Sequence, residues 1–393
     1  MKEKILILSG PFGEGHKQAA QALLETCKLA KPNAEAVVVD FMEWTLPRLH
    51  GLSKTVFHQG VQKFPSLYGY LFKRTRKPST LSSLTSRLRW YGLKRIVKLL
   101  DDVRPSVVVS TFPLAAAAMS ALKTAGLTDI PTVTVITDHT DHSYWIHPGT
   151  DRYVVGSEKV RKGLGGWGVA DYRVTVTGIP VRPTFFTGAA NVDRSALRAK
   201  LGLRTDKPVL LLMGGGYGMM SAGMIRLTVE AAKSKAMQVV VVCGHNEKLR
   251  HKLEERLALE APGHDVRVTG FIRNMEEYMG ASDLIVTKPG GLTTAEAIAM
   301  RLPMVLYRPL PGQEEDNAEF LTGAGVAVRA EDDEELTALV FTLIASPETL
   351  QAMRLDAERL HMETSSLQAL EAIVSARHIP VPRWENAVVR VGV

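Results

Sequence analysis

The sequence predicts an α/β protein with two doubly wound domains, each built on a parallel sheet between layers of helices. Short β-branched runs alternate with helical stretches along most of the 393 residues. The alternation breaks once, at the Gly- and Pro-bearing stretch 178–183 and the small-residue stretch 187–191. Glycine-rich loops follow strands in both halves. Two such domains facing each other would place a ligand cleft between the carboxyl ends of their strands.

Each half supplies its elements in chain order. The first domain, residues 1–185, is expected to have a helix at 15–31, a helical insertion at 44–100, and strands at 4–8, 34–40, 106–110, 132–136, 152–155 and 174–177. The second, residues 192–365, is expected to have strands at 208–213, 237–243, 266–269, 284–286, 303–306 and 326–328. Helices in the second half are expected at 218–235, 247–259, 275–279, 293–300, 314–321, 334–344, 347–360 and 364–377.

Composition excludes several classes of protein. A 45% hydrophobic and 23% charged chain can form a packed core and is not globally disordered. The two cysteines, Cys27 and Cys243, lie far apart, which excludes a disulfide scaffold and paired CxxC zinc knuckles. The longest apolar stretch, 107–122, is interrupted by Ser110, Thr111 and Pro113, so no spanning helix is expected. The apolar stretch at the start is too short for a signal peptide.

Charge is concentrated in one segment. The chain has 48 Lys and Arg against 41 Asp and Glu, yet residues 44–100 contain twelve basic residues, no acidic residue and eight of the 25 aromatics. Cations mixed with aromatics favour an interfacial membrane surface that binds anionic lipid. Nucleic-acid binding and a solvated basic insertion use the same residue types and are the alternatives. The candidate membrane residues are Trp44, Phe64, Tyr68, Arg74, Lys77, Arg87 and Trp90.

A glycine loop joins the first strand to the first helix. It reads Gly10-Pro-Phe-Gly13-Glu-Gly15-His16 and matches neither the dinucleotide fingerprint nor the P-loop. Its backbone N–H groups could approach an anionic or hydroxylated ligand, and a plain tight turn is the alternative. At the start of a helix, the pKa of His16 is expected to be lowered, which keeps the imidazole neutral and able to accept a proton. The alternative is that His16 packs or caps.

Two glycine loops in the second half suit a diphosphate. Met213-Gly-Gly-Gly216-Tyr-Gly218 follows a strand, and three consecutive glycines are expected to serve no packing purpose. Thr287-Lys-Pro-Gly-Gly291-Leu-Thr293-Thr294-Ala-Glu296 again runs from a strand through Gly-Gly into a helix. There Thr293 or Thr294 can offer a hydroxyl to phosphate, and Glu296 can accept both ribose hydroxyls of a nucleotide.

Two further loops contain polar side chains after strands. In Pro311-Gly312-Gln313-Glu314-Glu315-Asp316-Asn317, the side chains of Gln313, Glu314 and Asn317 could bond sugar hydroxyls, or the acids could simply favour a first helical turn. The loop 137–147 concentrates Asp and His, but its spacing fits no metalloprotease pattern and no metal is expected. Asp138 and His142 are better interpreted as acid–base or acceptor-binding groups.

Together these motifs resemble the monogalactosyldiacylglycerol synthases and processive diacylglycerol glucosyltransferases of glycosyltransferase family 28. The resemblance covers nearly the whole chain and rests on five stretches: Gly13-Glu-Gly15-His16-x-x-Ala19-Ala20, Thr137-Asp138-x-x-x-His142-x-x-Trp145 with Asp151-x-Tyr153, Thr177-Gly-Ile-Pro-Val-Arg-Pro183, Thr287 to Glu296, and Pro311 to Asn317. It implies a GT-B fold, an inverting mechanism, a UDP-sugar donor and a diacylglycerol acceptor. The tail 366–393 would pack back on the first domain, as in related folds.

The resemblance also implies roles for individual residues. His16 would be the general base, with Asp138 as the second candidate and His142 beside them, and Trp145 would touch lipid or acceptor. Phe271 and Ile272 would form the uracil pocket. The implied donor-binding set is Gly15, Gly215, Gly216, Phe271, Ile272, Gly291, Thr293, Thr294, Glu296, Gln313, Glu314 and Asn317.

The expected activity is transfer of a hexose, glucose in the first instance, from a UDP-sugar to 1,2-diacylglycerol and then to the monoglycosyl product. The enzyme would act as a peripheral protein at the cytoplasmic face of the cell membrane, with anionic lipids as partners, no nucleic acid and no obligatory metal. Two alternatives remain: a UDP-GlcNAc-type transferase with another lipid-linked acceptor, and a non-catalytic UDP-sugar sensor.

Overall fold

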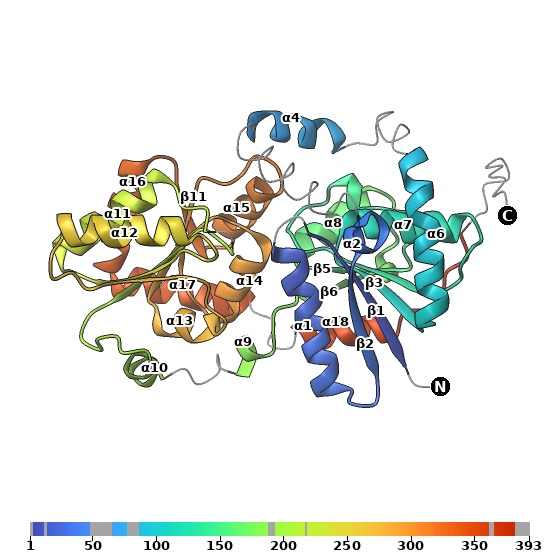
Figure 1. The fold of residues 1–393 in the computed structure, drawn as a ribbon, viewed down its shortest axis with the longest axis horizontal. Helices are drawn as coiled ribbons and strands as arrows, with labels where there is room; N and C mark the ends of the chain where they lie inside the picture. The colour runs from blue at the N-terminus through green and yellow to red at the C-terminus, as the bar shows by residue number, and fades with distance from the viewer. Residues whose placement is uncertain are drawn as a thin grey trace. The chain divides into compact units, whose positions relative to one another are not determined.

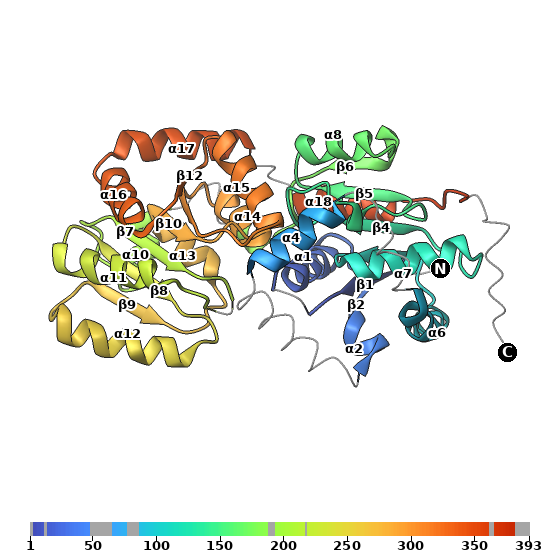
Figure 2. The same cartoon turned by 90° about the horizontal axis from the view of Figure 1, so that it is seen from above.

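The computed structural model describes residues 3–11, 14–47, 65–76, 86–187, 193–216, 218–360 and 365–381. The chain forms two compact units, Met1–Arg182 with Thr364–Val393, and Pro183–Glu363. Figures 1 and 2 label the elements of both units. The sequence placed the first boundary at residue 185, three residues beyond the one observed. Each unit contains one six-stranded parallel sheet, so the prediction of two doubly wound domains is confirmed.

In the first unit the strand order is β2-β1-β3-β4-β5-β6. Its strands are β1 Lys4–Ser9, β2 Glu35–Asp40, β3 Val107–Ser110, β4 Thr132–Val135, β5 Arg152–Val155 and β6 Val174–Val176. Its helices are α1 Glu14–Ala30, α2 Phe41–Thr45, α4 Pro65–Thr75, α6 Ser86–Val103, α7 Pro113–Thr124, η1 Ser143–Trp145, α8 Glu158–Gly166, η2 Asp171–Arg173 and α18 Ser365–Val374.

Alternation along β1 divides the core of the first unit into two faces. Ile5 and Ile7 pack on one face with residues of α1 and α18, and Leu6 and Leu8 pack on the other with residues of α2, α6 and α7. Figure 1 shows α18, in red, beside α1, in blue. The C-terminal helix therefore completes the core of the N-terminal unit.

In the second unit the order is β12-β11-β10-β7-β8-β9. Its strands are β7 Val209–Met213, β8 Gln238–Val242, β9 Val266–Thr269, β10 Leu284–Thr287, β11 Met304–Tyr307 and β12 Ala327–Ala330. Its helices are α9 Thr184–Thr187, α10 Arg194–Lys200, α11 Ala222–Ser234, α12 Glu247–Glu260, α13 Met275–Ala281, α14 Gly291–Ala299, α15 Gln313–Gly323, α16 Asp333–Ile344 and α17 Pro347–Leu360.

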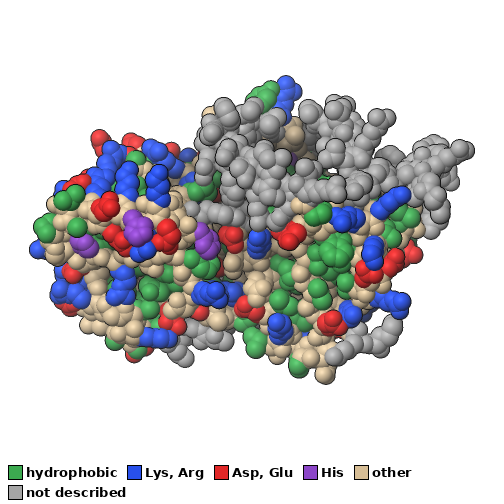
Figure 3. All heavy atoms as spheres, in the orientation of Figure 1, with side chains coloured by type: hydrophobic (Ala, Val, Ile, Leu, Met, Phe, Trp, Pro, Cys, Tyr) green, Lys and Arg blue, Asp and Glu red, His purple; other side chains and the backbone are tan. Residues whose placement is uncertain are grey.

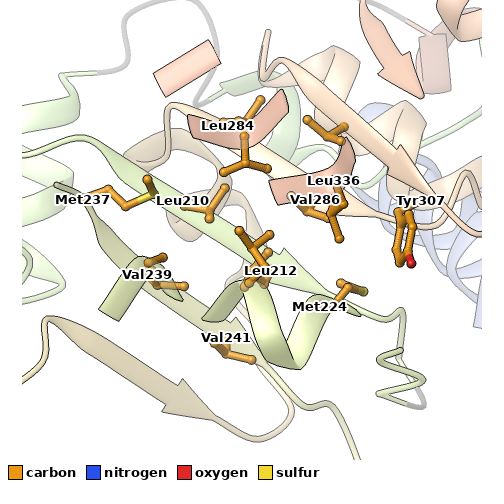
Figure 4. Packing of buried hydrophobic residues seen from close by; sticks show 14 of the residues in the cluster. Leu210, Leu212, Met224, Met237, Val239, Val241, Leu284, Val286, Tyr307 and Leu336 are labelled. Atoms are coloured by element: carbon orange, nitrogen blue, oxygen red, sulfur yellow. The ribbon is translucent and has the colours of Figure 1, made fainter. Parts of the chain in front are cut away.

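The largest core cluster lies in the second unit. Alternate residues of β7, Leu210 and Leu212, lie beside Val239 and Val241 of β8, and Met224 of α11 packs onto them (Figure 4). These strands are buried on both faces, as expected for a parallel sheet between two helical layers.

One predicted helix begins later than expected. The sequence placed it at 218–235, but α11 begins at Ala222, with Ser221 accepting the N–H of Met224 as its N-cap. Gly218 has φ +61°, and the N–H of Met220 bonds back to the carbonyl of Gly218. The glycine loop is therefore a turn that precedes the helix.

The described part of the chain contains mostly short helices, whereas a membrane span needs about 20 apolar residues. No single helix there is long and apolar enough to cross a bilayer. Only when α16 is taken together with α17 and α18 do helices reach the required length and composition, and the chain bends by 94° after α16.

Candidate active site

In the first unit the strand order reverses at β1, which pairs with β2 on one side and with β3 on the other. The loops after β1 and β3 therefore leave the sheet in different directions, and such a switch point is the usual ligand crevice of a doubly wound fold. His16, in the first turn of α1, lies at this point. The hydroxyl of Thr111, just after β3, donates to the carbonyl of His16 at 3.0 Å, and the Phe112 ring lies 5.4 Å from the imidazole.

His16 has the properties of a proton acceptor. Its Nδ1 lies 3.2 Å from the hydroxyl of Thr137, which follows β4. The His16 side chain is half-buried. Burial lowers the pKa of the imidazole to about 4, and a hydrogen bond with the backbone of Thr111 opposes that shift. The sequence attributed a lowered pKa to the helix N-terminus, whereas here burial is the main cause. At neutral pH the ring is uncharged and can take up a proton.

Asp138 adjoins Thr137 in sequence, so a half-buried carboxylate lies one residue from the hydroxyl that contacts His16. Asp138 is therefore connected to His16 through the contact of its neighbour Thr137. His16 and Asp138 are both half-buried, so burial does not distinguish them as bases. The role of Asp138 stays a prediction. Gly15, also assigned to the donor set, is half-buried in the first turn of α1.

His142 has fixed partners on both ring nitrogens. Nδ1 accepts the N–H of Tyr144, as the N-cap of η1, at 3.2 Å. Nε2 lies 2.8 Å from the carbonyl oxygen of Phe72, in α4. Because a carbonyl only accepts, the proton of the neutral ring is on Nε2. His142 is fully buried and connects the acid–base loop to the basic segment.

Trp145 differs from its expected position. The sequence places it against lipid or acceptor, but its side chain is fully buried in a cluster with Ile136, Tyr153 and Leu164. In the structure its Nε1 is buried and has no hydrogen-bond partner among the described residues. Its ring lies 6.0 Å from that of His16. Trp145 therefore forms part of the wall behind His16 and offers no surface to a bilayer.

The basic segment presents an aromatic and cationic surface where it is described. Tyr70 of α4 is 55% exposed, and the guanidinium of Arg74 lies over its ring, with Nε donating to the hydroxyl at 2.9 Å. Trp44 is 38% exposed, and its Nε1 donates to the carbonyl of Arg95 at 3.0 Å. Phe64 and Lys77 lie outside the described residues, as do the side chains of Tyr68, Arg87 and Trp90.

The visible face of the second unit has a different charge pattern. In Figure 3 its Lys and Arg side chains lie among Asp and Glu side chains. Arg250 pairs with Glu254, and Arg256 with Glu260, along α12. Basic residues without acidic neighbours in sequence are thus a feature of the segment 44–100.

In the second unit the order reverses at β7, which pairs with β8 and β10. The two diphosphate candidates follow these switch-point strands. Gly290, the residue before α14, has φ −71°, and a Cβ built on it would meet nothing within 4 Å. Gly215 has φ +73° and is equally open. These two positions leave room for a ligand beside exposed backbone.

Other glycines of the loop after β7 are required for packing, contrary to expectation. A Cβ on Gly218 would lie 1.8 Å from the carbonyl oxygen of Cys243, and one on Gly214 would lie 2.5 Å from the backbone of Met219. The carbonyl of Gly216 accepts the N–H of His245 at 3.2 Å. The glycines therefore have two roles. Some let the loop after β7 pack against the loop after β8, and Gly215 leaves one side of the loop after β7 open.

A stacked aromatic pair lies near the predicted uracil pocket. Phe271 is 45% exposed, and its ring lies parallel to that of His245, with 4.4 Å between centroids and 10° between planes. Ile272 is half-buried beside it in sequence. His245 is not among the site residues predicted from the sequence. The only signal was its place after a strand and Gly244, which has φ +55°.

Three predicted donor ligands have structural bonds that hold the loops. The hydroxyl of Thr294 donates to the carbonyls of Gly290 and Gly291, at 3.0 and 3.1 Å. Asn317 Nδ2 donates to the carbonyl of Pro289 at 2.9 Å. Thr294 and Asn317 are both fully buried.

Glu314 is the third of them. Its carboxylate accepts the N–H of Leu310 at 2.6 Å, and burial raises its pKa. The remaining candidates, Thr293, Glu296 and Gln313, are half-buried in the first two turns of α14 and α15, and Gly291 begins α14. Their donor contacts stay predictions. Within the described ranges, no three His, Cys, Asp or Glu side chains could hold a metal ion.

Comparisons with known proteins match both units. Residues 16–181 match the monogalactosyldiacylglycerol synthase family model, and residues 209–373 match the glycosyltransferase family 28 C-terminal domain. A processive diacylglycerol beta-glucosyltransferase of Bacillus subtilis (strain 168) is 32% identical over 390 residues, covering 95% of each chain.

Solved structures share the fold. Acinetobacter baumannii MurG has 15% identity and a TM-score of 0.58 over 95% of this chain and 99% of its own. Anabaena HepE in complex with UDP has 14% identity and a TM-score of 0.56 over 95% of this chain and 100% of its own. With the two parallel sheets, these likenesses establish the two-domain α/β GT-B fold.

Proposed function

The chain belongs to the family of the processive diacylglycerol beta-glucosyltransferases, and from this membership we propose that it transfers a hexose from a UDP-sugar to diacylglycerol. It is a UDP-sugar-dependent hexosyltransferase. Glucose is the proposed hexose, because the relatives named for it match over nearly the whole chain. The observation that carries the mechanism is the neutral, half-buried His16 at the switch point of the first unit.

We propose that His16 removes the proton of the free glycerol hydroxyl. The oxygen then attacks the anomeric carbon from the face opposite UDP, the bond from that carbon to the diphosphate oxygen breaks, and its electron pair leaves with UDP. The configuration is inverted, and the proton passes from His16 to solvent. Backbone N–H groups near Gly215 and Gly290 stabilise the departing diphosphate, so the proposal includes no obligatory metal.

The proposed donor site lies in the second unit and uses residues at the starts of α14 and α15 and after β9. Glu296 accepts the ribose hydroxyls, Gln313 contacts the hexose, and Phe271 with Ile272 borders the uracil. Thr294, Asn317 and Glu314 support this site by fixing the loops that carry it. Each buried group then stabilises a loop whose open side faces the ligand.

We further propose that the enzyme is peripheral, bound by its basic segment to anionic lipid at the cytoplasmic face of the cell membrane. Exposed Tyr70, Arg74 and Trp44 support this, since aromatic and basic side chains suit the headgroup region. The protein should co-sediment with vesicles that contain anionic lipid, and added salt should weaken that binding. Equal binding to neutral vesicles in high salt would contradict the electrostatic part.

Transfer assays with radiolabelled UDP-glucose, UDP-galactose and UDP-GlcNAc, each with diacylglycerol vesicles, test the activity. Labelled monoglucosyl- and diglucosyldiacylglycerol from UDP-glucose are expected. Transfer only from UDP-GlcNAc would support the alternative transferase, and UDP binding without product would support a sensor. A parallel assay in EDTA tests for a metal. EDTA would remove an obligatory ion, and turnover would then be lost.

A further inference from the structure

Helix α4, in the basic segment, has one lipid-suited face and one buried face. Tyr70 and Arg74 are exposed, whereas Phe72 is 6% exposed. The Phe72 ring packs 4.2 Å from the imidazole of His142 and 5.9 Å from the ring of Tyr144. The loop that follows β4 therefore holds the helix through its buried face.

The same loop also satisfies the C-terminal carbonyls of α4, which have no partner within a helix. His142 Nε2 donates to the carbonyl of Phe72 at 2.8 Å, and Ser143 Oγ donates to that of Thr75 at 2.7 Å. Arg76, directly after the helix, pairs with Asp141 at 2.8 Å. Three consecutive residues of the loop thus fasten the end of this one helix.

A series of ring contacts connects His142, which holds α4, to His16, the proposed base. His142 packs 4.2 Å from Tyr144, Tyr144 lies 5.7 Å from Trp145, and the Trp145 ring lies 6.0 Å from His16. All these residues belong to one unit, and both His142 and Trp145 are fully buried. Because a packed interior has little free volume, displacement of one of these rings would shift the rings that it contacts.

We propose that His142 is a positioning residue, which holds the lipid-facing helix α4 at a fixed place relative to His16, and that it takes no part in proton transfer. This rests on the proposed function, since it assumes that the acceptor arrives in a lipid surface. Both ring nitrogens are already bonded to backbone groups of the protein, one accepting and one donating. A ring so held cannot exchange a proton with substrate without losing one of these bonds.

Two substitutions separate the two bonds of His142. Glutamine can place a donor where Nε2 lies, and so keep the bond to Phe72. Asparagine can place an acceptor where Nδ1 lies, and so keep the cap on Tyr144 while losing the bond to α4. His142→Gln and His142→Asn thus form a matched pair, because each variant keeps one of the two bonds and loses the other.

The decisive experiment measures transfer from UDP-glucose to two acceptors, diacylglycerol in anionic vesicles and a short-chain diacylglycerol dissolved below its aggregation limit. For His142→Asn, the apparent KM for vesicle diacylglycerol should rise about fivefold to tenfold, the effect of one lost buried hydrogen bond. Its kcat with the dissolved acceptor should change less than about twofold. His142→Gln keeps the bond to Phe72, so its KM for vesicle diacylglycerol should stay near the wild-type value. Ser143→Ala removes a second bond to α4 and should shift the same vesicle KM in the same direction.

Amide hydrogen exchange gives a readout independent of turnover. Amides of residues 65–75 should exchange faster in His142→Asn than in His142→Gln. His139→Gln, at another buried histidine of this loop that bonds to Ser157, is the control and should leave exchange in α4 unchanged.

Three outcomes would overturn the inference. Equal loss of kcat on both acceptors in both His142 variants would make His142 a catalytic residue. Unchanged vesicle kinetics in His142→Asn would show that the bond to α4 has no role, and unchanged exchange in α4 would show that it does not hold the helix. Failure of the wild-type enzyme to glycosylate either acceptor would instead refute the proposed function, so the two failures are distinguishable.

Discussion

His16 Nδ1 lies 3.2 Å from the hydroxyl of Thr137, so the helix after β1 and the loop after β4 meet at the imidazole. The contact orients the ring between Phe112 and Trp145, whose centroids lie 5.4 and 6.0 Å away. A neutral imidazole held in one orientation by a side-chain hydroxyl is what general-base catalysis needs. The relationship predicts the consequences of altering either partner.

His16→Ala should fold and lose roughly 10²–10⁴-fold in kcat, the usual contribution of a positioned general base. Thr137→Val keeps the shape of a buried side chain and removes only the hydroxyl, so a smaller loss, about tenfold, is expected. Both are measured by initial rates with UDP-glucose and diacylglycerol vesicles. Calorimetric UDP affinity is the control and should match the wild type. Near-normal turnover by His16→Ala would exclude this residue as the base.

The stability of the first unit should fall as the pH drops below about 6.5. Burial lowers the pKa of His16 to about 4, and burial with nearby Lys159 lowers that of His139 to about 3. Below the usual value of 6.5 the unfolded chain binds protons that the folded chain does not, so each histidine removes up to ~1.4 kcal/mol of stability per pH unit. The loss should level off near the folded pKa values and be absent above pH 7.

Urea unfolding at successive pH values tests this expectation. His139→Gln removes one of the two groups and should flatten the decline between pH 6 and 4, whatever it does to stability at pH 7. An unchanged slope in that variant would mean that the pKa of His139 is not depressed in the folded protein.

Much of the fold could be predicted from the sequence because buried parallel strands are short, uninterrupted β-branched runs. All twelve strands lie within two residues of their predicted bounds. Helices α7 and α8 were not predicted. Helix α7 consists largely of Ala and other small residues without a clear polar face, and α8 contains Gly163, Gly165 and Gly166, which obscure a helical pattern.

The loops of the candidate site could be predicted, but the orientation of several side chains could not. Glycine clusters directly after strands are local signals. By contrast, Asn317 turns toward Pro289, 28 residues away, and His142 toward Phe72, 70 residues away. Trp145 packs inward for the same reason: its neighbours come from separate strands and α8. Tertiary contacts of this kind leave no mark in local spacing.

Gly290→Ala and Gly218→Ala should separate donor binding from folding. Alanine at 290 would stand in open space at an ordinary φ of −71°, so stability should change by less than ~0.5 kcal/mol, while affinity for UDP falls because the methyl group occupies the side open to the ligand. Alanine at 218 would combine φ +61° with a Cβ 1.8 Å from a carbonyl oxygen and should destabilise by several kcal/mol.

Thermal unfolding and UDP calorimetry on both glycine variants check this pair. If Gly290→Ala bound UDP like the wild type, the start of α14 would not be the diphosphate site.

Glu296→Gln should weaken the binding of every ligand that contains a ribose. A carboxylate can accept both ribose hydroxyls, whereas the amide keeps one accepting oxygen and no charge, and a hydrogen bond to a charged group contributes about 1.5–3 kcal/mol. UMP, UDP and UDP-glucose should therefore all bind about 10- to 100-fold more weakly in calorimetry. Glu334→Gln, an exposed acid in the first turn of α16, is the matched control and should bind them normally.

The ribose itself supplies the sharper comparison for Glu296. 2′-Deoxy-UDP lacks one of the two hydroxyls, so the wild type should bind it more weakly than UDP, and the variant should hardly distinguish the two nucleotides. Coupling of this kind arises only between groups in contact, because the effects of distant changes add. If the variant discriminated between UDP and 2′-deoxy-UDP as strongly as the wild type, another group would accept the 2′-hydroxyl, and Glu296 would act on α14 alone.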